Sequence, residues 1–259
     1  MCLNMNKQET ERYDQQQHGT HVTPIAIANL QGTVTLWIII ACVALFVIQA
    51  LLNLLGIWLY QASYPILGLS RNGLAHGMIW QVLTSPFLHF GLQHLLFNML
   101  SLMFFGGDVE QYLGRGKYIV FSLICALTGS IGFLLFGTAT SIGAGYSGVI
   151  YGILAASAVL WPNRRILLFW LFPIKLKWAM LIFGLALLFI AVQPGKDAIA
   201  QSAHLGGAVA GLIYITIWKY WHTRQKQNIS DNIRASQPSD TKQKIQKNRS
   251  TAIRVPDEL

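Results

Sequence analysis

The chain is 259 residues long, and 53% of its residues are hydrophobic while only 11% are charged. Soluble domains carry about 25% charged residues, so this composition excludes an ordinary soluble protein and indicates a polytopic membrane protein with polar ends. Nine of the 19 lysines and arginines behind the net charge of +9 lie at or after Lys219. Next to a membrane span, such a tail indicates the cytoplasmic side and contact with anionic lipid rather than nucleic-acid binding.

The three cysteines lie far apart, and two of them fall within apolar runs (Cys2, Cys42, Cys125). This spacing predicts neither a disulfide framework nor a thiolate metal site. Residues 1–33 are polar and glutamine-rich, and they lack the basic region and short apolar stretch of a cleavable signal. We therefore expect three parts: this N-terminal segment, a membrane domain over residues 34–218, and a basic, disordered tail over residues 219–259.

The first apolar run, residues 34–60, is about 27 residues long, whereas a membrane-spanning helix needs only about 20. We expect this span to be tilted or to extend into the membrane interface. Residues 61–78 follow as a loop that contains Pro65 and three glycines. The aromatic and apolar side chains of this loop indicate that it lies at the interface.

The second apolar run, residues 79–105, contains two histidines and an asparagine (His89, His94, Asn98). Ionisable residues inside membrane segments are rare and indicate a functional site by default. His94 and Asn98 are four residues apart and share one helix face. The spacing and the lack of a nearby carboxylate or thiolate disfavour a metal site, so we expect no metal, but a purely structural hydrogen bond between helices stays open.

The next two spans follow a polar turn over residues 106–117. The third covers residues 118–137, and a loop of small residues then leads into the fourth, residues 147–161, which begins at Ser147. At about 15 residues this helix is roughly 22 Å long, whereas the hydrocarbon core is about 30 Å thick. Ser147 is therefore expected below one membrane surface, at a helix N-terminus whose free N–H groups can stabilise negative charge. The alternative is a serine that merely caps a helix.

Residues 163–177 combine four basic residues with an apolar stretch, which is typical of a segment at the charged interface. The fifth span is expected over residues 178–192 and the sixth over residues 198–218. The sixth span carries His204 on the same helix face as Gly207 and Gly211. A lone histidine in an apolar helix is usually a satisfied core residue, so the neighbouring small residues are what make this one notable.

Six spans place both termini on the same side of the membrane. If that side is the cytoplasm, seventeen of the 19 basic residues lie there, and only Arg71 and Lys196 lie outside. The positive-inside rule favours this assignment strongly. In this topology Ser147, His204 and the two histidines of the second span all lie in the outer half of the membrane, at one depth.

Two pairs of glycines, each pair spaced four residues apart, predict which helices touch. Gly148 and Gly152 line one face of the fourth helix, and Gly207 and Gly211 line one face of the sixth. Small residues on facing helices let the backbones approach closely in lipid. We therefore expect the fourth and sixth helices to pack tightly.

This packing brings His204 within reach of Ser147. No carboxylate is expected at this depth, so the prediction is a Ser–His dyad rather than a triad. Burial disfavours the imidazolium form, which leaves His204 neutral and able to accept the serine proton. Tyr151, one turn after Ser147, is expected to pack against the imidazole. The Ser147 N–H, the His94 side chain and the Asn98 amide would stabilise an oxyanion.

Taken together, these motifs resemble the rhomboid family of intramembrane serine proteases. The resemblance covers residues 34–218 and depends on the order and spacing of three motifs: Gly145-Tyr146-Ser147-Gly148, His89-x4-His94-x3-Asn98, and Ala203-His204-Leu205-Gly206-Gly207 with Gly211. It implies an all-α, six-transmembrane-helix rhomboid-type bundle with a short fourth helix that starts inside the membrane. It also implies cleavage of single-pass transmembrane proteins in or near their membrane segment, without a cofactor.

The resemblance implies roles for individual residues as well. Ser147 would be the nucleophile and His204 the general base, with His94 and Asn98 at the oxyanion site. Supporting positions would be His89, Gly145, Gly148 and Tyr151, the last stacked on His204. In the family the second and fifth helices flank the path of the substrate, and Phe97 would lie on that gate.

Two positions depart from the family pattern. Gln81 follows Trp80 where many members have arginine, which puts the anchoring of the first loop in doubt. Bulky Tyr146 precedes Ser147 where a small residue is common, which is expected to reshape the mouth of the site. The intact Ser–His pair argues against the main alternative, a catalytically silent relative that binds membrane helices. The absence of an internal repeat and of an acidic relay argues against a transporter. The compact six-span size suggests a bacterial inner membrane.

Overall fold

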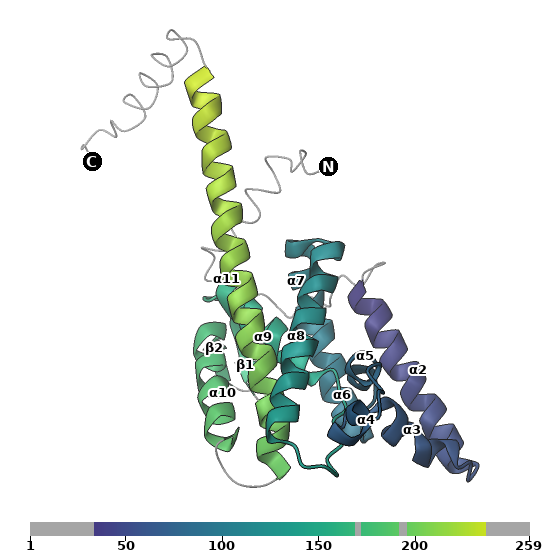
Figure 1. Cartoon of the computed structure of the whole chain (residues 1–259). Coiled ribbons are helices and arrows are strands. Elements are labelled where there is room, and N and C mark those ends of the chain that lie inside the picture. The colour runs from purple at the N-terminus through teal and green to yellow at the C-terminus, as the bar shows by residue number, and fades with distance from the viewer. Residues whose placement is uncertain (1–33, 169–171, 192–195, 237–259) are drawn as a thin grey trace. The chain divides into compact units, whose positions relative to one another are not determined.

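A computed structural model describes residues 34–168, 172–191 and 196–236. The expected N-terminal segment, residues 1–33, and the last part of the tail, residues 237–259, lie outside the described residues. The chain divides into two compact units, residues 1–215 and residues 216–259. Helices dominate the first unit, and Figure 1 shows how they follow one another along the chain.

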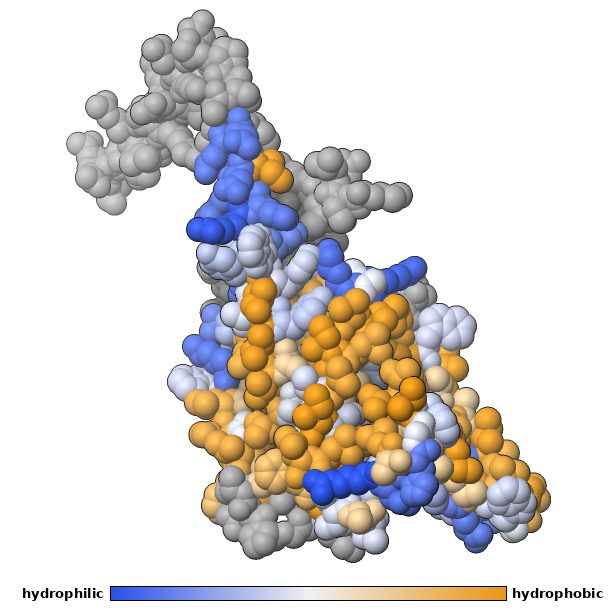
Figure 2. Space-filling model, viewed as in Figure 1, coloured by the Kyte–Doolittle hydropathy of each residue, from blue (hydrophilic) through white to orange (hydrophobic). Residues whose placement is uncertain are grey.

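Among the described residues, three helices are long and apolar enough to cross a membrane: α2 (Val34–Leu54), α8 (Arg115–Phe136) and α11 (Lys196–Ser236), the last of them over Ile199–Asn232. A bent pair of helical segments, Gln81–Phe87 and Leu92–Leu113, makes a fourth if it is counted as one span. Two apolar helices are shorter, α9 (Ser147–Leu160) and α10 (Leu176–Ala191). Large hydrophobic side chains are exposed along α2, α8 and α10, and Figure 2 shows them over much of the viewed face. These apolar helices mark an integral, multi-pass membrane protein.

The second apolar run is not the single continuous helix that its hydrophobicity predicts. It consists of α5 (Gln81–Thr84), a 3₁₀ turn (Ser85–Phe87), α6 (Leu92–Ser101), a π-helical turn (Leu102–Gly106) and α7 (Gly107–Leu113), with a bend of 94° between its two halves. Pro86 fits only at the start of a helical turn, because it has no N–H to donate. Beyond it the exposed carbonyl of His89 is satisfied by a distant segment, since the Tyr64 hydroxyl donates to it over 2.9 Å. The expectation of one helix over residues 79–105 was therefore wrong, and His89 lies in the break.

The polar turn expected over residues 106–117 is also mostly helical. Helix α7 continues to Leu113, and the turn is confined to Gly114, whose φ of +79° favours glycine. Glu110 of this helix is only 2% exposed and makes a long-range contact instead of facing solvent in a turn. Its carboxyl oxygens accept hydrogen bonds from the backbone N–H groups of Val34 (2.8 Å) and Thr35 (2.9 Å) and from the Thr35 hydroxyl (2.8 Å). Glu110 thus satisfies the free N–H groups at the start of α2 from a position 75 residues away.

The first loop is more ordered than its composition indicates, because it contains α3 (Leu59–Leu67) and α4 (Arg71–Ala75). Gln81 is fully buried and holds this loop. Its Oε1 accepts from the Ser70 N–H (3.0 Å), and its Nε2 donates to the Pro65 carbonyl (2.8 Å). The doubt that Gln81 raised about loop anchoring was misplaced: a glutamine, which can both donate and accept, ties the loop to α5.

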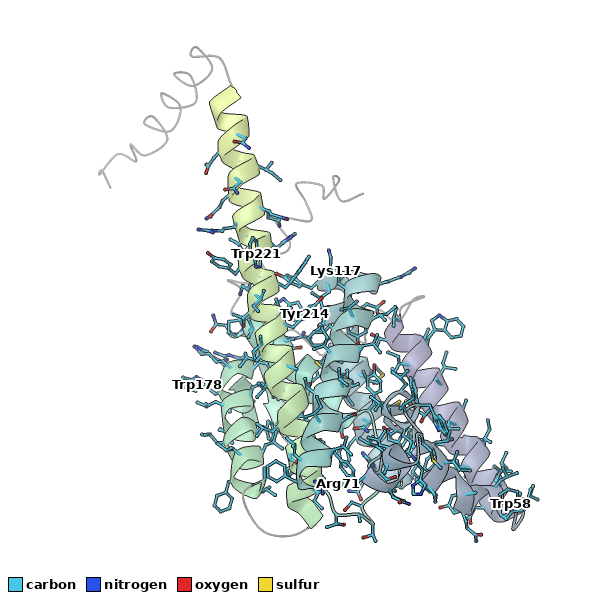
Figure 3. All side chains as sticks on the ribbon, viewed as in Figure 1. Trp58, Arg71, Lys117, Trp178, Tyr214 and Trp221 are labelled. Atoms are coloured by element: carbon cyan, nitrogen blue, oxygen red, sulfur yellow. The ribbon has the colours of Figure 1, made fainter. Side chains whose placement is uncertain are left out.

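Basic residues mark the two ends of α8 in Figure 3. Lys117 lies near the start of the helix, and Arg71 lies beside its far end. The Arg71 guanidinium donates to the carbonyl groups of Leu134 (2.7 Å) and Leu135 (3.1 Å). A positive charge near a helix C-terminus is favoured by the helix dipole. Arg71 therefore fastens the first loop to the end of α8.

The remaining elements surround α9. Helix α9 packs against both α8 and α10 (Figure 1). The segment expected at the charged interface is a two-stranded antiparallel hairpin, β1 (Arg165–Leu168) and β2 (Phe172–Lys175), in which Arg165 pairs with Lys175. Arg164, just before β1, forms an ion pair with Asp108 of α7. The hairpin is therefore tied to the end of the bundle where the basic residues gather.

Helix α11 continues beyond the expected end of the sixth span at residue 218. It reaches Ser236, so residues 219–236 are helical and the expectation of a disordered tail was wrong for them. The sequence has no glycine or proline between Gly211 and Pro238, and it is rich in lysine, arginine and glutamine there. These residues favour a helix, and nothing in this stretch interrupts it.

Candidate active site

Glycines bring α9 and α11 together. A Cβ atom added to Gly207 would collide with the carbonyl oxygen of Gly148, and one added to Gly211 would lie 2.5 Å from the Cα of Gly152. Real Cβ atoms do not approach a backbone so closely, so only glycine fits at Gly207 and Gly211. The glycine pair of α9 (Gly148 and Gly152) therefore faces the glycine pair of α11 (Gly207 and Gly211), as their spacing predicts.

This contact sets the distance between Ser147 and His204. The Ser147 Oγ lies 2.7 Å from the His204 Nε2, which is the length of a hydrogen bond. Ser147 is the first residue of α9, so its backbone N–H has no partner within the helix. The ring of Tyr151 stacks on the imidazole, with centroids 4.5 Å apart and an interplanar angle of 24°. Helix α9 thus presents the serine and the aromatic support of the histidine on one face.

A cavity of about 210 Å³ opens beside this pair. Its polar lining includes Ser147, His204 and His94, and its apolar lining comes mostly from α8 and from the loop before α9. Small residues such as Gly143, Ala144 and Gly145 form the loop side. The cavity therefore places a hydroxyl and two imidazoles in a largely apolar space.

Gly145 lets the α6 side chains approach the loop. Its φ is +117°, a conformation that residues with a side chain rarely adopt. A Cβ at this position would lie 2.6 Å from the His94 ring and 3.5 Å from the Asn98 Nδ2. His94 and Asn98 therefore converge on the backbone two residues before Ser147.

His89 positions Asn98. It is fully buried, and its Nε2 lies 2.9 Å from the Asn98 Nδ2, while its Nδ1 lies 3.3 Å from the Phe87 carbonyl oxygen. A carbonyl can only accept, so Nδ1 donates to it and Nε2 accepts from the Asn98 amide. This arrangement leaves the second N–H of the Asn98 amide free of His89. Both ring nitrogens of His89 are therefore engaged, one with the Phe87 carbonyl and the other with the Asn98 amide.

Comparison with known proteins shows the family of this chain. A family model described as a rhomboid domain matches residues 76–221, more than half of the chain. The chain belongs to the rhomboid family. It is 30% identical over 195 residues to the rhomboid protease GlpG of Klebsiella pneumoniae, an alignment that covers 70% of this chain and 61% of that protein. It is 28% identical over 201 residues to the rhomboid protease GlpG of Yersinia pestis, with 74% and 64% covered. The chain thus spans somewhat less than two thirds of the length of these curated relatives.

Two positions of this rhomboid chain lie away from the cavity lining. Phe97, on α6, is 60% exposed, which suits a side chain on the outside of the helix. Tyr146 is only 5% exposed, and the centroid of its ring lies 6.0 Å from the centroid of the Phe87 ring. Its bulk therefore lies in the core, and the expectation that it reshapes the mouth of the site was wrong.

One residue that contacts the site was not predicted from the sequence. The Oε1 of Gln201 lies 2.9 Å from the Nδ1 of His204. The signal that could have found it is its spacing, because a residue three positions before His204 shares its helix face. Among the described residues, no three histidines, cysteines or carboxylates gather in a way that could hold a metal ion.

Proposed function

We propose that this chain is an intramembrane serine endopeptidase that cleaves single-pass transmembrane proteins in or near their membrane segment. The observation that carries the proposal is the 2.7 Å contact between the Ser147 Oγ and the His204 Nε2 beside a cavity in a membrane protein. A serine next to a neutral imidazole is the activated nucleophile of many hydrolases. Relatives named as proteases support the assignment.

In the first half of the reaction, the Ser147 Oγ attacks the carbonyl carbon of the scissile peptide while its proton moves to the His204 Nε2. The tetrahedral intermediate collapses when the C–N bond breaks, and the leaving amine takes the proton from Nε2. An acyl ester on Ser147 remains. Water then attacks this ester and gives a proton to Nε2, and the C–O bond to Ser147 breaks as the hydroxyl regains its proton.

The oxyanion would be stabilised by three donors: the backbone N–H of Ser147, the side chain of His94 and the free N–H of the Asn98 amide. The first lies at a helix N-terminus, where the dipole also favours negative charge. Asn98 is held by His89, so it would not have to reorganise as charge develops. Donors fixed in advance in a largely apolar site act more strongly than the same donors in water.

Replacing Asn98 with alanine is expected to lower the reaction rate by about 10²-fold, the low end for one oxyanion donor, because two donors remain. The measurement is the rate at which a fluorophosphonate probe labels Ser147 in native membranes. Asn53→Ala, at an exposed position of α2, is the matched control and should label at the wild-type rate. Equal rates for Asn98→Ala and the control would contradict the oxyanion assignment.

The membrane topology is part of the proposal. Six spans over residues 34–218, formed by α2, the bent pair, α8, α9, α10 and the first part of α11, would leave both termini in the cytoplasm of a bacterium. The excess of basic residues on that side supports this orientation. The substrate would then enter from the lipid between α6 and α10, past the exposed Phe97. No cofactor takes part in the proposed chemistry.

The decisive test of the proposed function is labelling by a serine-directed fluorophosphonate in native membranes, since this requires no known substrate. We expect labelling of the wild type and none of Ser147→Ala or His204→Ala. An unlabelled wild-type protein that is folded would contradict the proposal and favour a relative that only binds membrane helices. Helix binding would then be tested before cleavage.

A further inference from the structure

The imidazole of His204 has two ring nitrogens, and the proposed reaction uses only one of them. Nε2 faces the Ser147 Oγ, whereas Nδ1 lies 2.9 Å from the side-chain Oε1 of Gln201. Both residues belong to α11, one turn apart, so the helix itself holds the pair in register. Among the described residues, Ser147 and Gln201 are the hydrogen-bond partners of this ring.

The position of the ring proton decides whether His204 can act as a base. A neutral imidazole carries one N–H, and only the unprotonated nitrogen can accept a proton. If Nε2 held the proton, it could not take one from Ser147. The amide oxygen of Gln201 can only accept a hydrogen bond, so it favours the tautomer with the proton on Nδ1.

We propose that Gln201 is a positioning residue, whose side-chain carbonyl holds His204 in the tautomer that leaves Nε2 free to accept the Ser147 proton. This inference rests on the proposed function and deepens it, because it adds a third member to the expected dyad. The third group is a neutral amide on the same helix as the base, three residues before it.

A neutral third group suits the surroundings of the site. A carboxylate at this position would have to leave water for a membrane-embedded, largely apolar pocket, and such a transfer is costly. An amide orients the ring without burying a charge. Among the described residues, the other groups around the ring include no carboxylate: Ser147 and Tyr151 contact it from α9, and His94 lines the same cavity.

The tautomer can be measured without any proteolysis. In the full-length chain labelled with ¹⁵N-histidine, the nitrogen shifts of His204 report which ring nitrogen carries the proton, and the His204→Asn variant identifies the signal. We expect the Nδ1–H form to dominate in the wild type and the Nε2–H form to gain population in Gln201→Met, which keeps the side-chain length but removes the acceptor. Unchanged His204 shifts in folded Gln201→Met would overturn the proposal.

The kinetic arm uses the fluorophosphonate probe over a range of concentrations. In Gln201→Met the labelling rate at saturating probe should fall about three- to tenfold, which is what one neutral hydrogen bond is worth, while the half-saturating concentration stays the same. Gln201→Glu restores an acceptor and should label faster than Gln201→Met. Gln49→Met removes a buried amide of α2 that bonds to Ser63, far from His204 in sequence, and should label at the wild-type rate.

The two arms separate this proposal from the proposed function. A wild-type protein that shows no labelling contradicts the peptidase assignment, while the nitrogen shifts still decide the role of Gln201. An equal loss of labelling in Gln49→Met and Gln201→Met would indicate a general structural effect and overturn the positioning role. A Gln201→Glu variant no faster than Gln201→Met would overturn it as well.

Discussion

Ser147→Ala is expected to reduce cleavage of a single-pass transmembrane substrate by roughly 10⁴- to 10⁶-fold, because the variant lacks the Oγ that forms the acyl intermediate. His204→Ala should cost about as much, since the serine hydroxyl would then lose its proton acceptor at 2.7 Å. Residues that act as one unit are not additive, so the double variant should be no worse than either single one. The measurement is the initial rate of product formation in proteoliposomes.

Both variants should remain folded. Ser147 loses only a hydroxyl, and the close packing of α9 against α11 depends on glycines, not on the dyad. Thermal unfolding in detergent provides this control, with midpoints expected close to that of the wild type. Normal turnover by Ser147→Ala would refute the mechanism. A double variant far slower than both single variants would mean that the two residues do not act together.

Gly207→Ala is expected to disable the protein by moving helices apart. The added Cβ would overlap the carbonyl oxygen of Gly148, which is backbone and cannot rotate away. Overpacking of this kind costs about 1–3 kcal/mol of unfolding free energy. A shift of about 1 Å between α9 and α11 would also separate Ser147 from His204, and such a misplacement can cost about 10²-fold in rate. The measurements are the unfolding free energy and the rate of fluorophosphonate labelling.

Gly184→Ala is the matched control for this prediction. Gly184 also lies inside an apolar helix, α10, but a Cβ added there meets nothing within 4 Å. Alanine in a helix interior is favoured over glycine by roughly 0.5–1 kcal/mol, so this variant should be as stable as the wild type or slightly more stable. Wild-type stability and labelling of Gly207→Ala would show that α9 and α11 do not need the observed contact.

The local sequence pattern was sufficient to predict the position of several helices in the membrane domain. The apolar runs expected over residues 118–137, 147–161 and 178–192 end within one residue of α8, α9 and α10, because a long apolar stretch bounded by charged residues or glycine has few other solutions in a membrane, whereas α11 continues well past residue 218. Ser147 begins α9 as its glycine-rich approach predicts. The spacing of Gly148, Gly152, Gly207 and Gly211 predicted which helices approach each other, since small residues four apart form a flat strip on one face.

Contacts between distant segments could not be predicted in this way. The bend between Phe87 and Leu92 depends on Tyr64, which satisfies the exposed carbonyl of His89 from another element. The start of α2 depends on Glu110, and the order of the first loop depends on Gln81. Each polar group has several possible partners in the sequence, and only the fold decides which one is within 3 Å.

In the candidate site, too, some features follow from the sequence and others only from the tertiary structure. By itself the sequence determined that a serine, three histidines and an asparagine lie in apolar surroundings, and the spacing of the small residues determined that α9 and α11 approach each other. The tertiary structure decided the orientation of these groups: His89 beside Asn98, Tyr151 under His204, and Gln201 on the far nitrogen of the same ring. Apolar burial follows from composition along the chain, whereas a hydrogen bond needs two atoms at a defined distance and angle, which only the packed helices supply.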